Sequence, residues 1–126
     1  MLDKDNWKGF DNMLKEKMLK MVKESEGIKL FVLNDILDYG DEDEDIKGYI
    51  ENVLNYGCVS GVVNSLTYYY QTKNFFQKYF EEILEVAEEV KEEYGINNID
   101  LNYNSLSWLA YEEIVQRIAV ELDLDI

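Results

Sequence analysis

The spacing of apolar residues constrains the fold of this chain more than any other feature of its sequence. Large apolar side chains recur every three or four residues along most of the chain, which is typical of amphipathic helices. Residues 10–22 predict a first helix that stops near Gly27. The apolar run at residues 30–37 also fits a short strand, but its continuation favours a short helix with Gly40 as its C-cap.

Residues 46–66 predict two more helices. The first has its apolar face at residues 46–54 and is expected to stop at Gly57. The second begins with a new apolar face at residues 59–66, where interspersed small residues allow a close approach between helices.

The longest helix is predicted over residues 73–94, with Thr72 as its N-cap and Gly95 at its end. The side chains expected in its buried stripe are Phe76, Tyr79, Phe80, Ile83, Leu84, Ala87 and Val90. The aromatic residues around its beginning are expected to lie mostly in the core.

A last helix follows a turn-rich connection and is predicted to end near Leu122, with Ser105 or Ser107 as its N-cap. The length of 126 residues fits one domain, and an apolar content of 47% can fill a core. We therefore expect residues 1–126 to form a single compact all-α domain, a bundle of about five or six helices.

Missing residue types exclude several kinds of chemistry. The chain has no His, so zinc sites of the usual kind and His-dependent catalysis are excluded. The single cysteine, Cys58, has no nearby base in the sequence to activate it and is expected to be a packing residue. An enzyme that uses only carboxylates or tyrosines is the least favoured alternative. We therefore expect a protein that is not an enzyme and that holds no cofactor and no metal ion.

The sequence also indicates where the protein acts. No apolar run approaches the roughly 18 residues that a membrane span needs. A single cysteine cannot form an internal disulfide, which fits a reducing compartment. We expect a cytoplasmic protein that does not bind membranes.

Charge is distributed unevenly along the chain. The formal net charge is −15, yet residues 1–29 carry seven Lys and six acidic residues, for a net charge of +1. Residues 30–126 therefore carry a net charge of −16. A field of this sign repels nucleic acid and anionic lipid and attracts basic protein surfaces. The expected partner is a basic protein rather than DNA or RNA itself.

Two acidic segments and two tyrosines are the candidate partner-binding residues. They are Asp41, Glu42, Asp43, Glu44, Asp45, Glu81, Glu82, Glu85, Glu88, Glu89, Glu92, Tyr69 and Tyr70. Glutamates four residues apart on a helix lie about 6 Å apart, which is similar to the spacing of successive phosphates along a nucleic-acid strand. An ordinary solvated helix face is the competing interpretation, although neighbouring glutamates repel one another and mixed charge would be more stable.

The acidic run at residues 41–45 also resembles part of a calcium-binding loop. Asp41, Asp43 and Asp45 match the first three ligand positions of an EF-hand. However, Ile46 stands where the loop requires Gly, and Asn52 stands where it requires a bidentate Glu. The run is therefore expected to cap a helix N-terminus rather than to bind calcium.

Residues 57–69 and residues 107–114 form two segments that resemble a family of small acidic proteins from phages and prophages of Firmicutes. Residues 57–69, GCVSGVVNSLTYY, are similar to a GCVSGMV..LIYY segment of that family, with Val62 in place of the usual Met. Residues 107–114, SWLAYEEI, are similar to its C-terminal helix. The resemblance implies a phage-encoded protein in the host cytoplasm, but it carries over no catalytic residues.

The resemblance and the charge together lead to one hypothesis. Small acidic phage proteins often look like inhibitors of host defence nucleases, as anti-CRISPR or antirestriction proteins that mimic nucleic acid. We therefore expect a non-enzymatic inhibitor whose acidic surface occupies the basic groove of a nuclease complex. The alternative is an assembly module that binds through an apolar patch, for which the first helix offers Met13, Met18 and Met21, although these methionines are more readily interpreted as core residues. A homodimer is compatible with either hypothesis.

Overall fold

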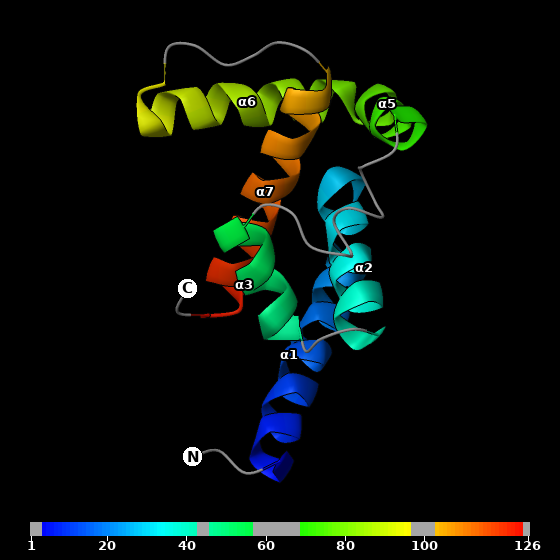
Figure 1. Ribbon diagram of the computed structural model, residues 1–126, viewed down its shortest axis with the longest axis vertical. Coiled ribbons are helices and arrows are strands. Elements are labelled where there is room, and N and C mark those ends of the chain that lie inside the picture. The colour runs from blue at the N-terminus through cyan, green and yellow to red at the C-terminus, as the bar shows by residue number, and fades with distance from the viewer. Residues whose placement is uncertain (1–3, 43–45, 57–68, 97–102, 125–126) are drawn as a thin grey trace.

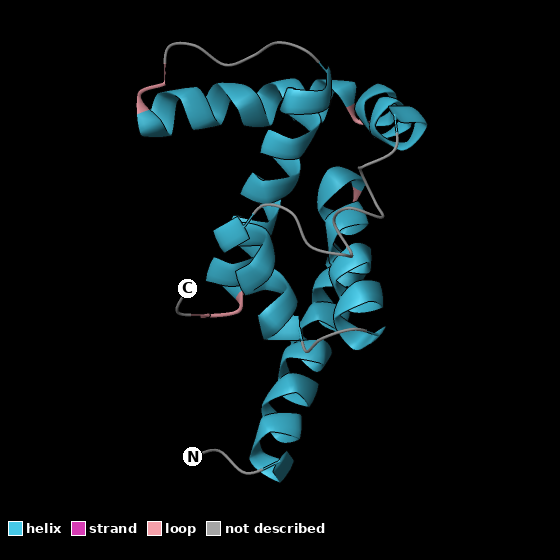
Figure 2. Cartoon of the chain, viewed as in Figure 1, coloured by secondary structure: helices cyan, strands magenta, loops and turns pink. Residues whose placement is uncertain are grey.

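The computed structural model describes residues 4–42, 46–56, 69–96 and 103–124. Its helices are α1 (Lys4–Glu24), α2 (Gly27–Glu42), α3 (Ile46–Tyr56), α5 (Tyr69–Lys78), α6 (Phe80–Tyr94) and α7 (Tyr103–Glu121). No strand occurs within these ranges (Figure 2), so the expected all-α fold is confirmed. None of these helices is both long and apolar enough to cross a membrane.

Helix α7 is the centre of the packing. It contacts α2, α3, α5 and α6, whereas α1 packs against α2 and α3. Because α7 has neighbours on several sides, its buried positions spread over a wide arc that includes Leu106, Ala110, Val115 and Ala119. Figure 1 shows α6 lying across one end of the molecule, with α7 leading away from it. The beginning of α1 extends from the opposite end.

A hydrogen-bond network of two tyrosine hydroxyls and one carboxylate joins α2, α3 and α7. Tyr111 of α7 and Tyr49 of α3 are almost completely buried, and their hydroxyl oxygens lie 2.9 Å apart. The Tyr111 hydroxyl also donates a hydrogen bond to Asp35 Oδ2 of α2, over 3.0 Å. Burial, followed by the nearby charge of Asp35, holds the pKa of Tyr111 well above its usual value. Tyr111 therefore remains a neutral donor at physiological pH.

The first two helices run further than the sequence predicted. Helix α1 ends at Glu24, in agreement with a stop near Gly27, and Gly27 begins α2 with a φ of +66°. The expectation that Gly40 is a C-cap is wrong, because α2 continues through it to Glu42. A glycine without a positive φ lowers helix stability but does not by itself end the helix.

The predicted long helix is in fact two helices. Tyr79 separates α5 from α6, with a φ of −115° and a ψ of 27°. Phe75 and Tyr79 are four residues apart and both lie in the core, where their rings pack against Phe31 of α2. Phe80, the first residue of α6, is not buried as expected and has 46% of its surface exposed.

The predicted buried stripe and the predicted end of this helix are confirmed only in part. Ile83, Ala87 and Val90 are buried as expected, whereas Leu84 is 38% exposed and Val86 takes a core position. The end of α6 at Gly95 is confirmed, since Gly95 has a φ of +65° and its N–H donates to the Lys91 carbonyl.

Both predicted N-caps after residue 70 are wrong. Thr72 lies inside α5 and is 1% exposed. Ser105 and Ser107 lie inside α7, which begins at Tyr103, and Ser107 faces the core with no exposed surface. A side chain directed into the core cannot turn back to the free N–H groups of a helix end.

The end of α3 at Tyr56 agrees with the expected stop at Gly57. The helix expected at residues 59–66 and Cys58 lie outside the described residues.

Candidate acidic interface

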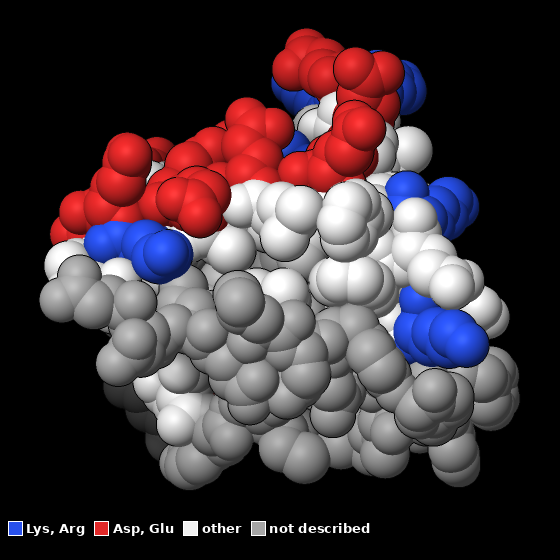
Figure 3. Space-filling view, turned by 90° about the horizontal axis from the view of Figure 1, so that it is seen from above, with Lys and Arg blue, Asp and Glu red and all other residues white. Residues whose placement is uncertain are grey.

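Helix α6 has a buried side and an acidic side. Ile83, Val86, Ala87 and Val90 are at most 6% exposed and hold the helix against the core. Four exposed glutamates follow one another along the opposite side, and we call them the outer row: Glu81, Glu85, Glu88 and Glu92. At a rise of about 1.5 Å per residue, the row is roughly 16 Å long. Figure 3 shows acidic side chains gathered in a band along α6, with uncharged side chains beside it.

The outer row is nearly free of compensating charge. Its ion pair with a described residue joins Glu88 to Lys91 over 3.9 Å, and the Glu88 side chain is still 72% exposed. Such a long, exposed pair contributes little to stability. The row therefore presents several negative charges to solvent at a regular spacing.

Glu82 has a structural role instead. Its Oε2 accepts a hydrogen bond from the backbone N–H of Ile28, over 3.0 Å, and so caps the N-terminus of α2. The carboxylate lies so close to Gly27 that a Cβ at that position would collide with it. Glu82 is a predicted partner-binding residue, but its carboxylate is already used within the protein.

Glu89 is also engaged within the protein. Arg117 of α7 donates from Nη2 to Glu89 over 2.5 Å and from Nε to Glu113 over 3.3 Å. Burial lowers the pKa of Arg117, but its hydrogen bonds and attraction to Glu89 and Glu113 outweigh this effect and raise it. Arg117 shares its one positive charge between Glu89 and Glu113, and its bond to Glu89 ties α6 to α7.

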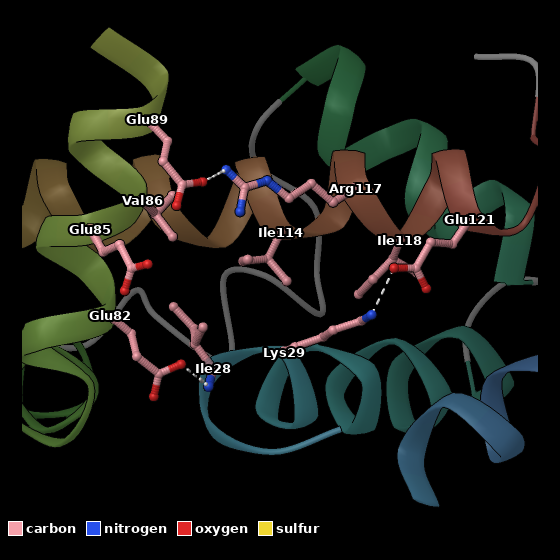
Figure 4. Close-up of a pocket in the computed structure, with 10 residues that line it drawn as sticks. All are labelled: Ile28, Lys29, Glu82, Glu85, Val86, Glu89, Ile114, Arg117, Ile118 and Glu121. Atoms are coloured by element: carbon pink, nitrogen blue, oxygen red, sulfur yellow. Dashed lines mark hydrogen bonds and ion pairs between the residues drawn. The ribbon is translucent and has the colours of Figure 1, made fainter. Parts of the chain in front are cut away.

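A hollow of about 330 Å³ lies beside Glu82 and Glu89 of α6, and the beginning of α2 and α7 form its other sides. The residues that line it are Ile28, Lys29, Glu82, Glu85, Val86, Glu89, Ile114, Arg117, Ile118 and Glu121 (Figure 4). Lys29 and Glu121 form an ion pair of 2.7 Å at one side, and Arg117 and Glu89 form one at the other. The sequence does not indicate either of these pairs, because Lys29 lies 92 residues from Glu121 and Arg117 lies 28 residues from Glu89.

The other predicted residues do not join this surface in the described structure. Asp41 and Glu42 form the end of α2, so the acidic run does not stand wholly before α3 as expected. Residues 43–45 lie outside the described residues. Tyr69 and Tyr70 begin α5, and their side chains are likewise outside the description. Within the described ranges, no three His, Cys, Asp or Glu side chains are grouped so that they could hold a metal ion.

Two apolar side chains next to the acidic side of α6 were not predicted as surface residues. Phe80 is 46% exposed and packs edge-on against Phe76, with their ring centroids 5.3 Å apart. Leu84, one turn further, is 38% exposed. No local pattern in the sequence indicates their exposure, because the apolar spacing continues through both positions.

A second hollow, lined by residues of α3, α6 and α7, holds a half-buried carboxylate. Leu54, Val90 and Leu109 contribute apolar surface to it, and Glu112 lies among its lining residues. Burial raises the pKa of Glu112 above its ordinary value of 4.5. The folded protein thus holds this proton more tightly than the unfolded chain does, and the charged form costs stability at neutral pH.

Replacing Glu112 by glutamine is therefore expected to raise the melting temperature at pH 7. The gain should shrink as the pH falls through the raised pKa of Glu112, because the wild-type side chain then becomes neutral as well. Thermal unfolding of both proteins between pH 7 and pH 5 measures this difference. Glu16→Gln, at an exposed site on α1, is the control. A gain that is equal at every pH, or no gain at pH 7, contradicts the assignment.

These features define an all-α protein that presents an acidic face on one helix, beside a charged hollow. Residues 11–124 match the family described as Domain of unknown function (DUF7222), and the chain belongs to this family. No curated protein and no solved structure matches the chain significantly.

Proposed function

We propose that this protein is a non-enzymatic inhibitor that binds the basic, nucleic-acid-binding surface of another protein. Its target is a nucleic-acid-directed defence complex of a bacterial host, as for an anti-CRISPR or antirestriction protein. The protein is encoded by a phage and acts in the host cytoplasm. The acidic side of α6 occupies a groove that otherwise holds phosphates.

The outer row is the observation that carries this proposal. Glu82 and Glu89 are satisfied within the protein, by the N-terminus of α2 and by Arg117 respectively. Glu81, Glu85 and Glu92 make no ion pair with a described residue, and all three are exposed. Stability alone gives no reason to concentrate like charges on one side of a helix, because neighbouring carboxylates repel one another.

The row supports mimicry of nucleic acid through its spacing and length. Carboxylates one turn apart lie about 5–6 Å from one another, so the row offers a line of charges rather than a single anion. A basic groove that binds several phosphates would meet several of these charges at once. Phe80 and Leu84 lie beside the row and add apolar contact area, which charge alone does not provide.

A second candidate function, an assembly module, is favoured by one feature of α1. Met13 and Leu19 are 43% and 48% exposed, although Met18 is buried in the core. Met21 is also partly buried against the core, so two of the three methionines follow the preferred core interpretation. A module that binds through Met13 and Leu19 would be nearly indifferent to salt.

Capture from a bacterial lysate separates the two functions. The tagged protein is immobilised, exposed to lysate and eluted with a salt gradient, with and without a DNA duplex or RNA as competitor. Electrostatic binding predicts a nucleic-acid-binding partner that leaves at moderate salt and that either nucleic acid displaces. A partner that stays bound in about 1 M salt, where the Debye length is about 3 Å, and that nucleic acid does not displace, would overturn the proposal.

A further inference from the structure

The hollow between α2, α6 and α7 combines an apolar floor with a charged rim. Ile28, Val86, Ile114 and Ile118 contribute apolar surface, and each of them is at most 5% exposed. The volume of about 330 Å³ lies at the lower end of the range for ligand pockets. The hollow is thus suited to one side chain or a small molecule rather than to a folded segment.

The rim carries more negative than positive charge. Two cations, Lys29 and Arg117, and four carboxylates line the hollow, which leaves a net charge of −2. Each cation is already bound to a carboxylate of the protein itself, at Glu121 and at Glu89. An anionic ligand would therefore meet repulsion and would have to break an existing ion pair.

Of the three α6 glutamates that line the hollow, Glu85 is the one whose carboxylate has no partner among the described residues. Glu82 accepts the hydrogen bond from Ile28, and Glu89 is paired with Arg117. Glu85 forms neither a hydrogen bond nor an ion pair with a described residue, and Figure 4 shows its carboxylate directed toward the hollow. It belongs both to the outer row and to the lining of the hollow. A cation that enters the hollow would thus bind Glu85, which is also part of the outer row that attracts the basic partner.

We infer that this hollow receives an arginine side chain of the basic partner, whose guanidinium binds Glu85 while its aliphatic part lies on the apolar floor. The inference rests on the proposed function. Arginine fits better than lysine, because its planar guanidinium pairs with a carboxylate through two hydrogen bonds and is more weakly hydrated than an ammonium group. Arginine is also enriched among the residues that dominate binding energy at interfaces.

The inference is tested with the intact protein and a minimal probe, N-acetyl-arginine amide. We expect a titration followed by NMR to shift the signals of residues that line the hollow, such as the amide of Ile28 and the side chain of Arg117. The neutral isostere N-acetyl-citrulline amide should give no such shifts. Glu85→Gln should weaken arginine binding about three- to fivefold, which is the effect of losing one exposed ion pair. Glu16→Gln on α1, which removes the same charge, should leave it unchanged.

Two results would overturn the inference. The first is a set of NMR shifts spread over the acidic residues without a focus at the hollow. The second is an equal affinity for arginine in Glu85→Gln and in the wild type. Either result would show that arginine binds nonspecifically. Parallel capture from lysate keeps this failure apart from that of the proposed function. If the hollow takes no arginine but the salt-sensitive partner is still captured, only the inference fails. If arginine binds the hollow but no salt-sensitive partner is found, the proposed function fails, and with it the basic partner as the source of the arginine, while the arginine site itself stands.

Discussion

Replacing Tyr111 by alanine is expected to lower the free energy of unfolding by about 3–5 kcal/mol. The side chain has no exposed surface, and its ring packs among Phe75 and Trp108, with centroids 6.5 and 6.3 Å away. The substitution leaves a cavity at the helix that contacts four others. Equilibrium unfolding in urea measures the loss.

The hydroxyl of Tyr111 can be tested separately with phenylalanine. Tyr111→Phe keeps the ring but removes the hydrogen bond to Asp35 and the contact with the Tyr49 hydroxyl, for an expected loss of about 1–3 kcal/mol. Tyr94→Phe is the matched control, because Tyr94 is 56% exposed and should change stability by less than about 0.5 kcal/mol. A Tyr111→Phe protein as stable as wild type would contradict the network.

Much of the fold follows from the spacing of apolar residues. The first helix, the stop near Gly57 and the end of α6 at Gly95 are all confirmed. The break at Tyr79 could not be predicted, because the apolar spacing continues through it without interruption. At this point Phe75 and Tyr79 both pack against Phe31 of another helix, a contact that has no local pattern in the sequence.

The acidic face could be predicted only in part. Helical spacing placed the glutamates of the outer row on one side of α6, and the structure agrees. The same spacing could not separate Glu85 from its neighbours Glu82 and Glu89. Their partners are Ile28, 54 residues away, and Arg117, 28 residues away. Contacts over such separations depend on how the helices pack and leave no local pattern in the sequence.

Reversing three charges of the outer row has the largest expected effect on binding. Glu81→Lys, Glu85→Lys and Glu88→Lys together should weaken binding to the basic partner about 100-fold or more at low salt, since each attraction becomes a repulsion. The fold should persist, because all three side chains are exposed and lysine is a good helix former. Circular dichroism and urea unfolding verify that the triple variant is folded.

The control must change the net charge equally. Glu16→Lys, Glu24→Lys and Asp38→Lys alter three exposed residues of α1 and α2, outside the α6 face. Each reversal adds two positive charges, so both triple variants move from a net charge of −15 to −9. Any difference between them therefore reflects the position of the charges rather than their sum.

The most direct measurement compares the wild type and both triple variants in binding to the captured partner, at the same low salt concentration. If α6 mimics nucleic acid, the outer-row variant loses binding while the control variant keeps affinity within about tenfold of the wild type. Equal binding by the outer-row variant and the wild type, or equal losses in both variants, would show that the acidic face of α6 is not the binding surface.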